Sequence, residues 1–74
     1  MAWRFPKGKK LIIVDSGGER HEGTSLGVEN AIWRPRRKSE PTLRVDIGNG
    51  IMAFPIRYIE RVDGNVVYVE GVVG

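Results

Sequence analysis

The apolar residues of this chain follow a two-residue period nearly everywhere, which is the spacing of side chains on one face of a β-strand. Leu43, Val45 and Ile47 show it most clearly, since one polar residue separates each from the next. Nowhere do apolar residues follow the 3.6-residue period of a helix behind a capping residue. At most one turn of 3₁₀ helix is expected, near Pro55–Tyr58. The 74-residue chain is therefore predicted to form one all-β domain.

Glycine-containing turns divide the predicted strands. The strongest turn signal is Gly48–Gly50, because Asn-Gly accepts the positive φ angles of a tight hairpin. Ser16–Glu19 and Asp63–Asn65 mark two further hairpins. Gly23–Glu29 is predicted to be a loop or irregular strand, and Arg36–Pro41 a polar loop. The predicted strands are Lys9–Asp15, Glu19–Gly23, Asn30–Pro35, Thr42–Ile47, Ile51–Phe54, Arg57–Val62 and Val66–Val73.

Short segments and tight turns in so small a chain favour one architecture, a small SH3-like barrel in which five to six of these segments are antiparallel strands. Residues 9–74 are predicted to form this barrel. Residues 1–8, which include Pro6 and Gly8, are predicted to be a partly ordered basic arm. Trp3 and Phe5 either belong to that arm or cover one open end of the barrel.

Residue types that support catalysis are scarce. The chain has no cysteine, which excludes disulfides, thiol chemistry and cysteine-ligated zinc. The single histidine, His21, lies between Glu19 and Glu22 in a predicted strand, and we expect it to be a solvated hairpin residue. The other carboxylates are scattered, so no metal-binding cluster is expected. The sequence predicts a protein that is not an enzyme and that uses no metal or cofactor.

Hydropathy and composition point to a cytoplasmic protein. The apolar run Leu11–Val14 is far shorter than the roughly 20 residues that span a bilayer, and a charged residue follows it at once. Neither a membrane partner nor a signal peptide is expected. The absence of glutamine beside many charged residues is typical of proteins from thermophiles.

Positive charge is concentrated in two blocks, although the net charge is only +3. Residues 1–10 and residues 33–44 each carry a net charge of +4. Residues 11–32 carry −3 and residues 45–74 carry −2. A polyanion is therefore expected to contact the two basic blocks.

The second basic block opens on Trp33 and is the predicted binding site. Arginine pairs with phosphate through its planar fork, and an indole ring stacks on bases. Trp33 is alternatively a core residue, but if its neighbour Ile32 is in the core, Trp33 faces outward. Glu40 and Asp46 interrupt the basic surface. The predicted nucleic-acid-binding residues are Trp33, Arg34, Arg36, Arg37, Lys38 and Arg44, with a secondary basic arm of Arg4, Lys7, Lys9 and Lys10.

The order of these segments resembles a known family. The hairpin around Gly17-Gly18, the Trp33-Arg34 pair, the basic loop after it and the strand Leu43–Ile47 are similar to the small SH3-like chromatin proteins of Crenarchaea. The resemblance covers roughly residues 9–55 and implies a barrel that binds duplex DNA through its tryptophan-bearing sheet. The chain departs from that family in having only four lysines, in Asp46, and in an additional C-terminal hairpin.

The alternative function is a protein-interaction module or a self-assembling subunit. Val66–Val73 has valines on both strand faces, so either both faces are covered or an apolar edge is exposed and invites pairing with a second copy. Phe54–Ile59 is similar to the end of SH3 peptide-binding domains, and Asp63–Val69 to the last strands of Sm-like proteins. This alternative predicts a homo-oligomer formed through the C-terminal strand.

Overall fold

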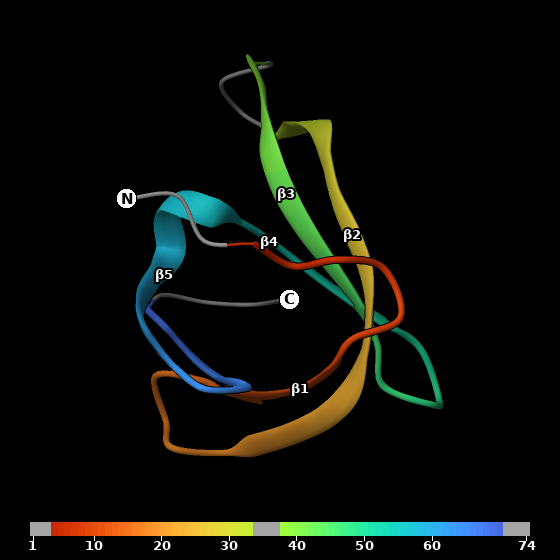
Figure 1. Ribbon diagram of the computed structural model, residues 1–74. Helices are drawn as coiled ribbons and strands as arrows, with labels where there is room; N and C mark the ends of the chain where they lie inside the picture. The colour runs from red at the N-terminus through yellow and green to blue at the C-terminus, as the bar shows by residue number, and fades with distance from the viewer. Residues whose placement is uncertain (1–3, 34–37, 71–74) are drawn as a thin grey trace.

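The computed structural model describes residues 4–33 and 38–70, and these form an all-β domain with one short 3₁₀ helix (Figure 1). No helix in the described part of the chain is long and apolar enough to cross a membrane. The elements are β1 (Lys10–Val14), β2 (Arg20–Trp33), β3 (Lys38–Asp46), β4 (Ile51–Pro55), η1 (Ile56–Tyr58), β5 (Ile59–Asp63) and β6 (Val66–Val69). The prediction of an all-β chain with one 3₁₀ turn near residues 55–58 is confirmed.

The six strands form one mixed sheet in the order β4-β3-β2-β1-β6-β5. Four of the neighbouring pairs are antiparallel, but β1 and β6 run parallel, with Ile13 opposite Val67. The prediction of purely antiparallel strands is therefore wrong. The parallel pair arises because β5 and β6 form a hairpin, and its second strand, not its first, lies beside β1.

The sheet is strongly curled. β4 and β5 lie at opposite edges of the sheet, yet only the three residues of η1 connect them. The four steps from Pro55 to Ile59 span at most about 14 Å, so the end of β4 and the start of β5 must lie close together. The described residues show no pairing between these two strands, and the sheet stays open there.

Alternating residues of several strands fill the space inside the curl. Leu43 and Val45 are fully buried, as the two-residue period predicts. Thr42, expected on the polar face, is also buried, and its hydroxyl donates a hydrogen bond to the carbonyl of Glu40 at 3.0 Å. The buried apolar residues are Phe5, Leu11, Ile13, Leu43, Val45, Met52, Phe54, Ile59, Val67 and Val69.

β2 continues through Gly23–Glu29, the segment predicted to be a loop or irregular strand, and a bulge in its register shows that the second alternative holds. Two glycines make this possible. Gly23 lets the neighbouring strand approach, since a Cβ there would lie 2.5 Å from the carbonyl oxygen of Asp46. Gly27 follows a bulge in the β2–β3 register and has a φ of +92°, which favours glycine. Gly23 and Gly27, which suggested a loop in the sequence, are therefore needed for the packing and pairing of β2 with β3.

β3 also begins earlier than predicted. Residues 38–41 belong to the strand, whereas the sequence pattern predicts a loop as far as Pro41. Pro41 pairs with Asn30 of β2, and the pairing of β3 with β4 begins only at Thr42. Proline is tolerated there because β3 is still an edge strand on its β4 side.

β6 lies inside the sheet, between β1 and β5. Val67 and Val69 are buried and Val66 is half-buried. On the other face, the Arg61 guanidinium lies 3.7 Å from the centre of the Tyr68 ring. Residues 71–73 of the predicted last strand lie outside the described residues. The described part of this strand is thus paired on both sides and is no free edge.

Candidate nucleic-acid interface

The far halves of β2 and β3 form a two-stranded ribbon. β1 pairs with β2 only as far as Thr24, and β4 pairs with β3 only from Thr42 onward. In the described part of the chain, the strand pairs of this region are therefore formed by β2 and β3 alone. Residues 28–33 of β2 pair with residues 38–43 of β3. Figure 1 shows this pair extending beyond the rest of the sheet. We call residues 28–33 and 38–43 the ribbon.

The ribbon ends at the predicted binding segment. The backbone of Trp33 pairs with that of Lys38, and the Lys38 side chain is exposed. Arg34, Arg36 and Arg37 lie outside the described residues, as does the side chain of Trp33. Arg44 follows Lys38 by six residues in β3, a distance of about 20 Å along a strand. Lys38 and Arg44, the predicted site residues whose side chains the structure describes in this block, thus lie at different points along β3.

Ile32 is not a core residue, because 71% of its surface is exposed. Val28, which shares its face of β2, is 43% exposed. The ribbon extends past the elements that would cover this face, so apolar residues at its end remain in solvent. Burial of Ile32 therefore gives no reason for Trp33 to face outward.

Arg44 is held by an acidic partner that the sequence pattern does not reveal. Its Nη1 donates to Oε1 of Glu29 at 2.6 Å, and the two side chains are 40% and 60% exposed. Asp46, the carboxylate expected to disturb this surface, accepts a hydrogen bond from the backbone N–H of Gly48 at 2.9 Å. The carboxylate that offsets Arg44 is therefore Glu29, which only the β2–β3 register brings near.

Glu40, the other acidic residue expected to interrupt the basic surface, has a cationic partner. Nε of Arg57, in η1, donates to Oε1 of Glu40 at 2.7 Å, and its guanidinium lies 4.8 Å from the centre of the Tyr58 ring. The bond to Glu40 raises the pKa of Arg57 above its ordinary value. Arg57 thus offsets the negative charge that Glu40 places on the ribbon.

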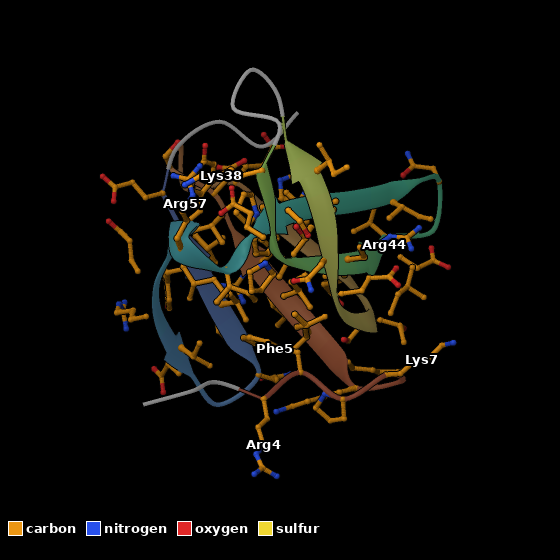
Figure 2. The ribbon with its side chains drawn as sticks, turned by 90° about the horizontal axis from the view of Figure 1, so that it is seen from above. Arg4, Phe5, Lys7, Lys38, Arg44 and Arg57 are labelled. Atoms are coloured by element: carbon orange, nitrogen blue, oxygen red, sulfur yellow. The ribbon has the colours of Figure 1, made fainter. Side chains whose placement is uncertain are left out.

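The predicted basic arm lies against the sheet at Phe5, which is buried in the core. Its cations Arg4, Lys7, Lys9 and Lys10 are exposed. Figure 2 shows Lys7 on the same side of the molecule as Arg44, whereas Lys38 and Arg57 lie on the opposite side. Of the labelled cations of the two basic blocks, Lys7 and Arg44 thus share one side of the molecule in this view.

The β1–β2 hairpin brings together a group that sequence spacing does not indicate. His21 Nε2 lies 3.1 Å from Oδ2 of Asp15, and potential ligand atoms of Asp15, Glu19 and His21 lie within 4.8 Å of one another. Oδ1 of Asp15 already accepts the backbone N–H groups of Gly17 and Glu19, both at 2.9 Å. The carboxylate of Asp15 therefore organises the hairpin turn.

Acid should weaken this hairpin. The hydrogen bonds from His21 and from the Glu19 backbone hold the pKa of Asp15 below its ordinary value. A lowered native pKa means that Asp15 stabilises the fold above about pH 4, and that this contribution is lost as the pH falls through the native pKa. Asp15→Asn removes the titrating group but keeps an acceptor oxygen.

The measurement is the urea midpoint of both proteins between pH 6 and pH 2. We expect the wild type to be the more stable protein at pH 6 and its advantage over Asp15→Asn to shrink toward pH 2. A gap that stays constant over this range would contradict the assigned role of Asp15.

No family model, no curated protein and no solved structure matches this chain. The class that the fold defines is a small all-β domain with a curled mixed sheet.

Proposed function

We propose that this protein is a non-enzymatic domain that binds duplex DNA through the end of the ribbon. The observation that supports this most is the ribbon itself, which extends past the sheet and ends at the Trp33–Lys38 segment. The major groove of B-DNA admits a two-stranded β-ribbon. In this proposal Trp33 makes an apolar contact, and Arg34, Arg36, Arg37 and Lys38 contact phosphates, with Arg44 farther along β3.

For the fold we propose a small SH3-like barrel. The succession of hairpins, the curl of the sheet and the 3₁₀ turn before the last two strands support it. Such a barrel provides a rigid base from which the ribbon is presented to a groove.

Binding of this kind must depend steeply on salt. With four to five phosphate contacts, log Kd should rise against log salt concentration with a slope of roughly 4. Between about 50 and about 200 mM salt the Kd then rises about 250-fold. Fluorescence anisotropy of a labelled duplex measures Kd directly at each salt concentration. Binding that does not change with salt, or no binding at low salt, would contradict the proposal.

The double variant Arg36→Ala/Arg37→Ala tests the location of the site. We expect Kd to rise at least about tenfold for unrelated sequences alike, and the salt slope to fall by about 2, because phosphate contacts carry no sequence information. The matched control is Arg20→Ala/Arg61→Ala, which removes the same charge from two exposed positions outside the ribbon.

Equal losses in the two double variants would mean that only net charge matters.

Light scattering of the purified protein tests the alternative function. An oligomer that does not respond to DNA would favour the interaction module.

A further inference from the structure

The N-terminal segment is held along β2 by backbone hydrogen bonds. The N–H of Gly8 donates to the carbonyl of Ser25 at 2.8 Å, and the N–H of Ser25 donates to the carbonyl of Lys9 at 2.7 Å. The buried hydroxyl of Ser25 donates to the carbonyl of Phe5 at 3.3 Å. Because Phe5 is also in the core, the position of Lys7 is determined by the fold.

Lys7 and Arg44 are neighbours of the same glycine. Gly27 pairs with Arg44 in the β2–β3 register. The Cβ of Lys7 lies 4.0 Å from the point that a Cβ on Gly27 would occupy. Gly27 has no side chain to separate the two cations, and Figure 2 shows both on one side of the molecule. Two cations far apart in the sequence thus border one short piece of backbone.

The two cations differ in their present partners. Arg44 is paired with the carboxylate of Glu29. Lys7 is exposed and forms no ion pair with any residue that the structure describes. A carboxylate offers a guanidinium the same kind of oxygen acceptors as a phosphate does. Glu29 therefore occupies a place on Arg44 that a phosphate oxygen can take.

We propose that Lys7 and Arg44 form a second phosphate-contact site, which holds one backbone phosphate of the bound duplex beside Gly27. The site rests on the proposed function and lies about 20 Å along β3 from the end of the ribbon. Glu29 competes with the phosphate for Arg44. Exposed ion pairs are weak, so a phosphate that contacts both cations displaces Glu29 readily.

Lys7→Ala tests the cation that the fold brings to this site. We expect Kd for a labelled duplex in about 100 mM salt to rise about fivefold to tenfold, and the salt slope to fall by about 1. The matched control is Arg20→Ala, which removes one exposed positive charge outside the ribbon and outside the predicted basic arm. A loss for Arg20→Ala as large as for Lys7→Ala would mean that binding responds only to net charge.

Glu29→Gln tests the competition for Arg44. Removing the competing carboxylate should lower Kd about threefold to tenfold, with a steeper salt dependence. Glu60→Gln, which changes the charge equally at an exposed position in β5, should change Kd much less. The gain should also vanish when Arg44 is replaced by alanine, because Glu29 then has no cation to release.

The outcomes for the two sites are distinguishable. If Arg36→Ala/Arg37→Ala loses binding but Lys7→Ala and Glu29→Gln bind as the wild type, the second site is wrong and the ribbon end stands. If the wild type does not bind duplex at low salt, both proposals fail together. Circular dichroism melting of each variant checks that the substitutions leave the fold intact.

Discussion

Phe54→Ala is expected to destabilise the domain by about 3–5 kcal/mol. Phe54 is only 1% exposed and has the largest of the fully buried side chains. It belongs to β4 and pairs with Leu43 of β3. Truncating it removes its buried apolar surface and leaves a cavity that the surrounding strands fill only in part. A domain of this length has a total stability of about 4–11 kcal/mol, so the variant approaches complete unfolding.

The same strand supplies the control for this prediction. Ile51 begins β4 and is 54% exposed, so Ile51→Ala should change stability by no more than about 0.5 kcal/mol. Urea denaturation followed by tryptophan fluorescence gives both values. Similar losses for the two variants would mean that the inner face of β4 does not form the core described above.

Gly23→Ala is expected to cost about 1–3 kcal/mol, although it adds a single methyl group. That methyl would lie 2.5 Å from the carbonyl oxygen of Asp46 and 2.7 Å from Cγ1 of Val45. The oxygen belongs to the backbone of β3, and Val45 is fully buried, so neither atom can move without shifting the strand. The variant should therefore force β2 and β3 apart.

Gly50→Ala is the matched control for this second prediction. A Cβ at Gly50 would meet no atom within 4 Å, and we expect its urea midpoint to stay close to that of the wild type. If Gly23→Ala were as well tolerated as Gly50→Ala, the close approach of β2 and β3 would not be a packing constraint.

The strands and turns that depend on local pattern could be predicted. Leu43 and Val45 face the core because a strand places alternate side chains on one face, and this holds whatever lies opposite. The turn at Gly64 has a φ of +62°, consistent with the predicted Asp63–Asn65 hairpin. Gly23 and Gly27 could not be interpreted locally, since the reason for each glycine is a contact with a distant strand or a break in register.

The candidate site also has features that the sequence shows and features that only the tertiary structure shows. The sequence alone singles out the basic segment and the cations of the first ten residues, because charge is visible in composition. It does not show that Glu29 holds Arg44, that Arg57 offsets Glu40, or that Lys7 lies beside Gly27. Each of these depends on the pairing of segments 15 or more residues apart.

The sequence by itself therefore determined the all-β class, the turns and the two basic blocks, because period, turn chemistry and charge are local properties. Only the tertiary structure decided the order of the strands and which charges meet. The parallel pairing of β1 with β6 joins residues more than fifty positions apart. Burial of the shared core selects that pairing, and a strand's own sequence does not specify which neighbour completes its hydrogen bonds.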